Sequence, residues 1–325
     1  MKARVWWLIL LLCVFPQAAP AADRIRIAYV SPSLSHAIPW IGKDTEIFRK
    51  HGFDSEVILI TGSPRVVQAL LAGDIEYAVA GATPAIRARM GGADAVILAS
   101  LSSVSNMKLM VHPKSGIKRI TDLKGKVLGV SQYGSEADVV ARIMISQGGL
   151  GPRDVNILQL GGHSQAAQAL IAGKLDAAIL GVQGLIVADK AGARVLVTAQ
   201  EFNIFAPNGT LMATRSYIQR NRDAVMRFMR GFVEAVHFFK TQREKSVAIM
   251  TKYMGGFSPE VLSLLHADQT EDFQPLPIPQ RDAIQAVLDR ETDPKAKSFK
   301  PEEFMDASFL QEIERSGFRR TLYNN

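Results

Sequence analysis

The sequence predicts an α/β protein of two lobes, in which each lobe is a mixed, mostly parallel β-sheet flanked by helices. Two observations support this fold class. From Arg24 onward, short β-rich runs alternate with helical patterns, which is typical of α/β units built on a largely parallel sheet. A gapless internal repeat also relates residues 67–81 to residues 167–181, which predicts two similar units.

Residues 1–22 have the pattern of a secretory signal peptide. Lys2 and Arg4 precede an apolar run from Val5 to Phe15, and a small-residue stretch follows up to Ala22, where cleavage is expected. The apolar run is about half of the roughly 20 residues that a membrane-spanning helix needs, and no later segment is uniformly apolar over that length. We therefore expect a mature chain that is soluble outside the cytoplasm.

Cys13 is the only cysteine and lies inside this predicted signal peptide. A lipoprotein signal would place a small residue before the cysteine, and this chain has Leu12 there, so we expect no lipid anchor. Since no cysteine remains after export, disulfides cannot stabilise the mature protein. An ordinary hydrophobic core must do so, and about 300 residues in two lobes suffice for one.

The charge balance mildly favours anionic partners. Removing Lys2 and Arg4 from the formal net charge of +7 leaves +5 for the mature chain, which favours anionic ligands or surfaces. The densest basic stretch, from Arg215 to Arg230, has no accompanying nucleic-acid-binding motif. We interpret it as a solvated helix face and expect no nucleic-acid partner.

The first elements predicted are a strand at 25–30, a helix at about 38–50, a strand at 56–61 and a helix at about 64–72. Each copy of the repeat then indicates a helix end, a glycine stop, a strand and a glycine turn. The glycines are Gly73 and Gly81 in one copy and Gly173 and Gly181 in the other. Glycine suits helix ends and tight turns. Chance similarity of two ordinary units is the alternative explanation, and a period this long excludes a solenoid.

After the second copy, the pattern changes to long helices. Apolar residues between Ala224 and Phe239 recur at helical spacing and predict a stripe that faces the core. Pro275, Pro277 and Pro279 predict an extended, helix-breaking segment. Further helices are expected after it.

Motifs in both halves resemble one protein family. The runs DLKGKVLGV at 122–130, YGSEAD at 133–138 and GLGP at 149–152 are similar to the second lobe of the nitrate/sulfonate/taurine-type substrate-binding proteins of ABC transporters. The first lobe of that family is similar to IPWIGK at 38–43, HGF at 51–53 and ALLAGD at 69–74. The resemblance covers nearly the whole mature chain.

The resemblance implies a type II periplasmic-binding fold. Lobe one would comprise residues 23–104 and 210–325, lobe two would comprise residues 105–209, and the C-terminal helices would pack on lobe one. It implies a periplasmic protein, usually a monomer, that closes on a small anionic or aromatic solute and delivers it to an ABC permease and ATPase in the inner membrane. A thiamine-precursor synthase branch of the superfamily carries a cysteine-rich motif, which this chain lacks after residue 13.

A ligand site is expected between the lobes. In open α/β sheets, ligands bind beyond the carboxyl ends of the strands, where loops lead into helix N-termini. The backbone N–H groups and positive dipole ends there suit carboxylate, sulfonate or phosphate groups. The candidate residues are Ser33, His36, Trp40, Gly62, Ser63, Gly81 and Thr83 in lobe one, and Tyr133, Gly134, Ser135, His163 and Gln183 in lobe two.

Several of these residues also have local structural interpretations. Thr83 is expected to cap a helix, Ser135 to form a capping box with Asp138, and Pro64 to occupy a first helical turn. Trp40 and Tyr133 are able to stack on an aromatic ligand, but Trp40 lies inside a predicted helix and suits the core equally well.

No metal site, cofactor or catalytic motif is predicted. The six histidines show no H-x-x-x-H spacing, and the chain contains no G-x-S-x-G elbow, P-loop or G-x-G-x-x-G turn, so we expect no enzyme. Two alternatives stay open. The chain could be the ligand-binding subunit of a sensory system, or an enzyme built on the same bilobed fold.

Overall fold

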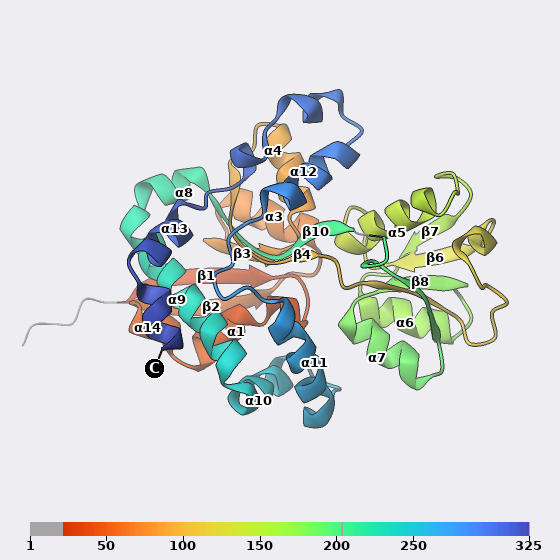
Figure 1. The fold of residues 1–325 in the computed structure, drawn as a ribbon, viewed down its shortest axis with the longest axis horizontal. Helices are drawn as coiled ribbons and strands as arrows, with labels where there is room; N and C mark the ends of the chain where they lie inside the picture. Colours follow the sequence, from red (N-terminus) through yellow and green to blue (C-terminus); the bar gives the residue numbers. More distant parts are fainter. Residues whose placement is uncertain (1–21, 203, 325) are drawn as a thin grey trace, which may run out of the picture.

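The computed structural model describes residues 22–202 and 204–324, without the side chains of residues 183, 206, 208 and 268. Residues 1–21 fall outside the described residues. They contain Cys13 and all of the predicted signal peptide except Ala22. Figure 1 shows two α/β lobes side by side, joined by chain segments that cross between them. Each lobe contains one five-stranded sheet, which confirms the predicted fold class.

Sheet one has the strand order β2-β1-β3-β10-β4. Its strands are β1 (Asp23–Tyr29), β2 (Phe53–Leu59), β3 (Tyr77–Ala80), β4 (Ala95–Val104) and β10 (Phe205–Thr214). Strand β1 is parallel to β2 and β3, whereas β10 is antiparallel to β3 and β4. The sheet is therefore mostly parallel, and β10 is its reversed strand.

Sheet two repeats this arrangement, with the order β7-β6-β8-β5-β9. Its strands are β5 (Lys108–Val111), β6 (Val127–Val130), β7 (Asn156–Gln159), β8 (Ala177–Leu180) and β9 (Arg194–Thr198). Strand β6 is parallel to β7 and β8, and β5 is antiparallel to β8 and β9. The chain thus passes from β4 into β5 and returns from β9 into β10. The domain boundaries at residues 104 and 210 remain a prediction.

Helices cover both sheets (Figure 1). Those of the first lobe are α1 (Ile38–Asp44), α2 (Ile47–Lys50), α3 (Ser63–Ala72), α4 (Thr83–Met90), α8 (Arg215–Arg220), α9 (Arg222–Thr241), α10 (Arg243–Tyr253), α11 (Pro259–Asp272), α12 (Arg281–Arg290), α13 (Ser308–Arg315) and α14 (Phe318–Tyr323), with the 3-10 turns η1 (Leu34–His36), η3 (Pro294–Ser298) and η4 (Pro301–Phe304). Those of the second are η2 (Ile120–Leu123), α5 (Glu136–Gln147), α6 (His163–Ile171) and α7 (Val182–Lys190). Within the described residues, no helix combines the length and apolarity needed to cross a bilayer.

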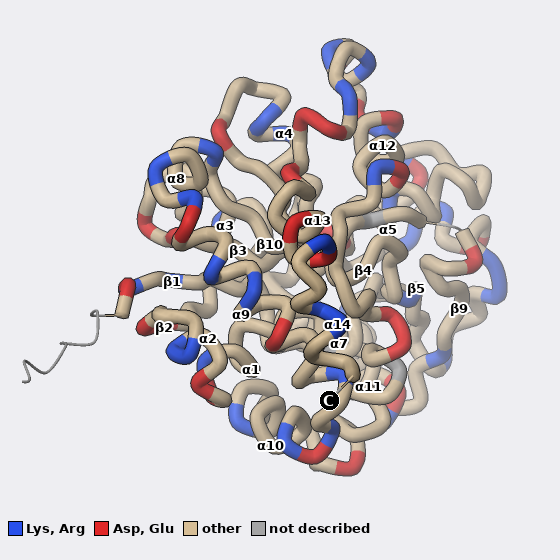
Figure 2. The backbone as a smooth tube through the Cα atoms, turned by 60° about the vertical axis from the view of Figure 1, so that its left-hand side comes forward, with Lys and Arg blue, Asp and Glu red and all other residues tan. Residues whose placement is uncertain are grey.

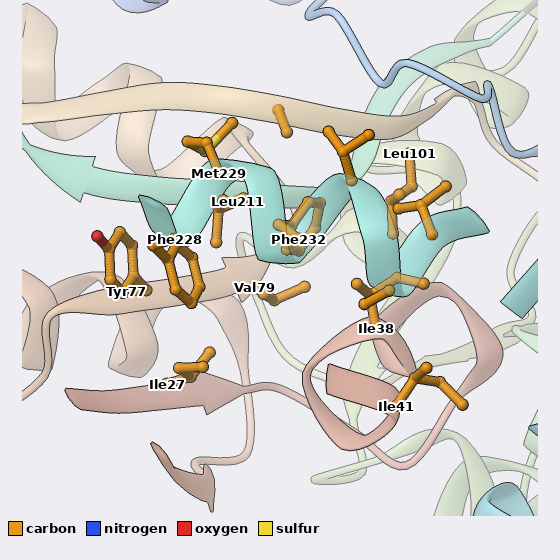
Figure 3. Close-up of a cluster of buried hydrophobic side chains, with 14 of the residues drawn as sticks. Ile27, Ile38, Ile41, Tyr77, Val79, Leu101, Leu211, Phe228, Met229 and Phe232 are labelled. Atoms are coloured by element: carbon orange, nitrogen blue, oxygen red, sulfur yellow. The ribbon is translucent and has the colours of Figure 1, made fainter. Parts of the chain in front are cut away.

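The largest core lies between sheet one and helix α9. The predicted apolar stripe occupies this helix, and Figure 3 shows Phe228, Met229 and Phe232 pointing toward the strands. The Phe228 ring stacks on Tyr77 of β3 with ring centroids 3.8 Å apart. Apolar burial of this kind is the main stabilising term of a fold, so the C-terminal helices are an integral part of the first lobe.

The segment predicted as one helix at 38–50 is two helices. The chain turns at Glu46, which has a left-handed backbone with φ of 60°. This turn folds α2 back so that the Phe48 ring lies directly over Gly42, where a Cβ atom would be only 2.3 Å from the ring. The prediction of a continuous helix was wrong because the residue pattern does not show the left-handed turn at Glu46.

The internal repeat occupies the same place in both lobes. Helix α3 ends at Gly73 with φ of +79°, and α6 is followed by Gly173 with φ of +70°, which confirms the predicted glycine stops. The Glu76 carboxylate accepts a hydrogen bond from Arg26 N at 2.6 Å, and the Asp176 carboxylate accepts one from Val127 N at 2.9 Å. The two copies therefore form the same helix-turn-strand unit with the same tie to the neighbouring strand.

The basic stretch from Arg215 to Arg230 lies on α8 and α9. Arg227 pairs with Asp23 at 2.6 Å, and Arg222 pairs with Glu312 at 3.4 Å. Figure 2 shows basic and acidic residues interspersed along the backbone in this part of the molecule. These arginines therefore act within a mixed, ion-paired surface.

Candidate ligand-binding site

A cavity of about 300 Å³ lies between the two lobes. It forms where β1, β2 and β3 end in lobe one and where β6, β7 and β8 end in lobe two, which is the position expected for a ligand in open α/β sheets. The segment between β4 and β5 is called the first crossover. The cavity is lined in lobe one by residues 30–36, 59, 61–63, 81 and 269, in lobe two by residues 131, 132, 135–137, 161–165, 181 and 182, and in the first crossover by residues 106 and 107.

His36 is a buried polar residue of the lobe-one wall, with 4% of its surface exposed. Its Nδ1 atom lies 2.7 Å from Ser33 Oγ and 3.3 Å from Ser31 Oγ. Its Nε2 atom is buried and has no hydrogen-bonding partner in the described structure. Burial lowers the pKa of His36 to about 4, so the ring is neutral at pH 7.

Gly209 of β10 fixes the position of this wall. Its φ is +57°, and a Cβ atom there would lie 2.5 Å from the carbonyl oxygen of Ser35. The loop that carries Ser33 and His36 therefore packs directly on the backbone of β10. Only glycine allows so close an approach with that backbone conformation.

The second part of the lobe-one wall is the start of helix α3. Pro64 lies in its first turn, as predicted. Ser63 Oγ accepts a hydrogen bond of 3.2 Å from Gly81 N. Across the cleft, Gln132 Nε2 donates a 3.4 Å hydrogen bond to the Thr61 carbonyl, so the two lobes meet directly beside Gly62.

The lobe-two wall repeats this arrangement. His163 stands at the start of α6, as Ser63 does at the start of α3, and its Nδ1 accepts a 3.2 Å hydrogen bond from Gly181 N. Burial lowers the pKa of His163 to about 4, so this ring is also neutral at pH 7. The same backbone position therefore carries the Ser63 hydroxyl in lobe one and the His163 imidazole in lobe two.

Glu136 is a cavity residue that the sequence reasoning missed. It is the first residue of α5, and its Oε1 accepts a 2.7 Å hydrogen bond from Ser105 Oγ in the crossover. Burial raises the pKa of Glu136 to about 7, although the bond from Ser105 opposes that shift. Its place within the YGSEAD motif, directly after the expected ligand residue Ser135, was the available signal.

The remaining missed residues are polar side chains that no motif marks. Gln269 reaches the cavity from α11, a C-terminal helix, and Asn106 comes from the crossover. Gln132 lies in the loop before α5, and Gln165 lies in the first turn of α6. Because α11 is far from the other cavity residues in the sequence, only tertiary packing brings Gln269 to the site.

Seven of the twelve sequence-predicted residues line the cavity, whereas Trp40, Thr83, Tyr133 and Gly134 are not among its lining residues. Those that line it are Ser33, His36, Gly62, Ser63, Gly81, Ser135 and His163. Trp40 is fully buried in the lobe-one core, stacked on Tyr253 with ring centroids 4.9 Å apart. Tyr133 is 47% exposed and donates to the Ile157 carbonyl. The Gln183 side chain lies outside the described residues.

Of the two predicted helix caps, Thr83 was wrong, and Ser135 takes the N-cap position without forming the predicted capping box. Helix α4 begins at Thr83 itself, with Ala82 as its N-cap, and Thr83 lines a separate cavity with Arg87 and Arg142. Ser135 is the N-cap of α5, but its hydroxyl donates to the Gln132 carbonyl at 2.6 Å and caps no helix amide. Asp138 instead accepts from Gly134 N at 2.9 Å. The loop before α5 therefore satisfies its own polar groups.

The cavity has an unusual charge distribution. Helices α3, α5 and α6 all begin at its walls, which places positive dipole ends and backbone N–H groups around it. No lysine or arginine is among its described lining residues. Its ionisable groups are His36, Glu136 and His163. Among the residues that the structure describes, no cluster of three histidine, cysteine, aspartate or glutamate side chains could hold a metal ion.

Comparisons with known proteins agree with the two-lobed fold described above. A protein-family model described as NMT1/THI5 like matches residues 33–246. A relative in Escherichia coli K12, provisionally named an aliphatic sulfonates-binding protein, is 26% identical over 252 residues, which cover 76% of this chain and 77% of that one.

Solved structures show the same fold. A protein from Bordetella bronchiseptica RB50 has a TM-score of 0.80 at 18% identity, with 93% of this chain and 98% of that chain covered. The periplasmic aliphatic sulphonate binding protein SsuA from Escherichia coli has a TM-score of 0.67 at 22% identity, with 86% and 92% covered. Both comparisons include the two lobes.

Proposed function

The chain belongs to the NMT1/THI5-like family, and from this premise we propose that it is the exported solute-binding component of an ABC importer. It binds a small solute in the cavity between its lobes and presents the closed form to a permease in the inner membrane, where an ATPase drives uptake. The single observation that carries this proposal is the cavity itself, which draws its polar residues from the strand ends of both lobes. It acts as a binding protein and not as an enzyme.

Three further points support the proposal. The relative in Escherichia coli K12 is named for sulfonate binding, and the similar solved structure from Escherichia coli is described as periplasmic. The start of the sequence has the pattern of a signal peptide, which fits a periplasmic location. A site shared between two lobes makes closure depend on the ligand, because only the closed form contacts it from both sides.

The proposal is tested with the mature protein, residues 23–325. A thermal-shift screen against sulfonates, nitrate, carboxylates, pyrimidines and aromatic acids should find a ligand that raises the melting temperature, because a ligand that binds only the folded state stabilises it by about 2.7 kcal/mol at a hundredfold excess over Kd. Small-angle X-ray scattering with that ligand should then show a smaller radius of gyration. A ligand that binds without any compaction would contradict hinge closure, because it would not distinguish the two forms.

A further inference from the structure

The cavity combines a carboxyl group with the absence of a basic side chain among its described lining residues. Glu136 contributes the carboxyl group, whereas His36 and His163 are both kept neutral at pH 7 by burial. A solute with only negative charge would meet favourable helix N-termini, but it would also meet the Glu136 carboxyl group, which is about half ionised at pH 7 and has no lysine or arginine beside it among the described lining residues. The walls therefore suit a simple anion only when Glu136 is protonated.

The Glu136 carboxyl group has unused hydrogen-bonding capacity. Its Oε1 accepts from Ser105 Oγ at 2.7 Å, and the described structure records no partner for Oε2. An ionised carboxylate has about four acceptor positions. Glu136 lines the cavity and is tied to the crossover through Oε1, so we assign Oε2 as the oxygen that accepts a hydrogen bond from a bound molecule.

The opposite wall presents a second polar atom that lacks a partner. His36 Nε2 is buried and unbonded, while Nδ1 of the same ring is engaged by Ser33. Buried polar atoms are nearly always hydrogen-bonded, so a solute that reaches this atom would supply a bond that the described structure lacks. His36 follows β1 in lobe one and Glu136 follows β6 in lobe two, so one solute that bonds to both would join the lobes.

Resting on the proposed solute-binding function, we infer that Glu136 determines ligand specificity by accepting a hydrogen bond from an amino or amide N–H group of the solute. The cleft then selects a nitrogen-bearing solute over a simple anion of the same size. The N–H group donates to a carboxylate that has no lysine or arginine beside it among the described lining residues. The oxygen atoms of the solute contact the backbone N–H groups at the starts of α3 and α6.

The test compares probe molecules in which an amino group is replaced by a hydroxyl group or by hydrogen. The two aliphatic pairs also differ in net charge, because their amines are protonated at pH 7, whereas the pyrimidine pair is neutral in both members. The pairs are 2-aminoethanesulfonate with 2-hydroxyethanesulfonate, 3-aminopropanoate with 3-hydroxypropanoate, and 4-aminopyrimidine with pyrimidine, and nitrate serves as a simple anion. Affinities are measured by calorimetry for the wild-type mature protein, for Glu136→Gln, and for Asp189→Asn as a control. Asp189 is exposed on α7 in the same lobe and lies outside the cavity lining, so the control makes the same charge change away from the site.

We expect the N–H-bearing member of at least one pair to bind at least tenfold tighter than its partner. Glu136→Gln should weaken that binding by about tenfold or more, as expected for the loss of a hydrogen bond to a charged group, whereas Asp189→Asn should bind like the wild type. An unchanged melting temperature of the ligand-free Glu136→Gln variant would show that the loss is not due to unfolding. Tight binding of nitrate or of a member without an N–H group, unaffected by Glu136→Gln, would overturn the inference and leave the binding function intact.

If no probe binds, immobilised wild-type protein is incubated with a small-molecule extract of bacterial cells, and retained compounds are identified by mass spectrometry. A retained compound with an amino or amide group, lost from Glu136→Gln but kept by Asp189→Asn, supports the inference. A retained compound without one overturns it. Retention of nothing overturns the proposed function itself, and the inference with it.

Discussion

Ser105 donates a 2.7 Å hydrogen bond to the Glu136 carboxylate, and so joins the crossover between the lobes to the wall of the cavity. Ser105 is almost completely buried. Its backbone N–H also donates to the Ile204 carbonyl at 3.0 Å, which ties the outgoing crossover to the returning one. A change at Glu136 therefore acts directly on the segment that must bend when the lobes close.

Replacing Ser105 with alanine should raise the pKa of Glu136 further, because the hydroxyl favours the ionised carboxylate. It should also cost about 1 kcal/mol of unfolding free energy, the usual net contribution of one hydrogen bond. Carbon-detected NMR titration reports the pKa, and urea denaturation reports the stability. Ser102→Ala is the matched control, since the Ser102 hydroxyl bonds to the Val104 carbonyl and not to Glu136. Equal pKa values in Ser105→Ala and the wild type would contradict the assigned bond.

Glu136 should also make folding stability depend on pH. Its pKa is about 7 in the folded protein against 4.5 for an unperturbed glutamate, so between these values the folded state holds more proton than the unfolded state. Stability from this group is therefore full below pH 4.5 and is lost as the pH rises to about 7. The unfolding free energy of the wild type minus that of Glu136→Gln should fall between pH 4.5 and about pH 7 and stay level above pH 7.

The two cavity histidines should act in the opposite direction. Burial lowers the pKa of each from 6.5 to about 4, so the unfolded state binds more protons between these values. Their stabilising contribution is full above pH 6.5 and is lost as the pH falls toward 4. Denaturation of His163→Gln across pH 4 to 8 should show a weaker loss of stability on acidification than the wild type. An identical pH profile would contradict a buried, neutral His163.

Gly209→Ala should destabilise lobe one by about 1–3 kcal/mol, because alanine would need a left-handed backbone and would clash with the Ser35 carbonyl. It should also weaken ligand binding, since the displaced loop carries Ser33 and His36. Chemical denaturation and calorimetry measure the two effects. Gly192→Ala is a useful control: Gly192 also has a positive φ, but its Cβ would meet no atom within 4 Å. Similar ligand affinity in both variants would argue against the packing role of Gly209.

Trp40→Ala should reduce the unfolding free energy by about 3–5 kcal/mol, because it removes a fully buried ring that stacks on Tyr253. Tyr133→Phe, at an exposed ring, should change it by no more than about 1 kcal/mol, the contribution of the bond to Ile157. Urea denaturation of both variants tests the assignment of Trp40 to the core. A small loss in Trp40→Ala would sink that assignment.

The fold and part of the site follow from local sequence features. The repeat around Gly73 and Gly173, the strand-end glycines and the apolar stripe of α9 are all short-range patterns, so they predict the two lobes. Ser63 and His163 were predicted because helix starts after strand ends are recognisable. Glu136 was missed because its neighbours, Ser105 among them, are distant in the sequence.

The wrong expectations have the same origin. Thr83 and Ser135 have residue types that commonly cap helices, but the hydroxyl of Ser135 bonds to a loop carbonyl that the sequence does not reveal. The break between α1 and α2 depends on the left-handed turn at Glu46. Both outcomes depend on the local path of the backbone, which residue types alone do not specify.

The equivalent placement of Ser63 and His163 has a consequence for how this molecule could diversify. Each side chain accepts a hydrogen bond from the glycine at the end of the following strand, on the same local backbone. The two halves of the binding surface together show that this framework accepts either an alcohol, as at Ser63, or an imidazole, as at His163. New ligand preferences are therefore accessible by exchanging single side chains on an inherited scaffold, with no new loop and no loss of the framework that holds it.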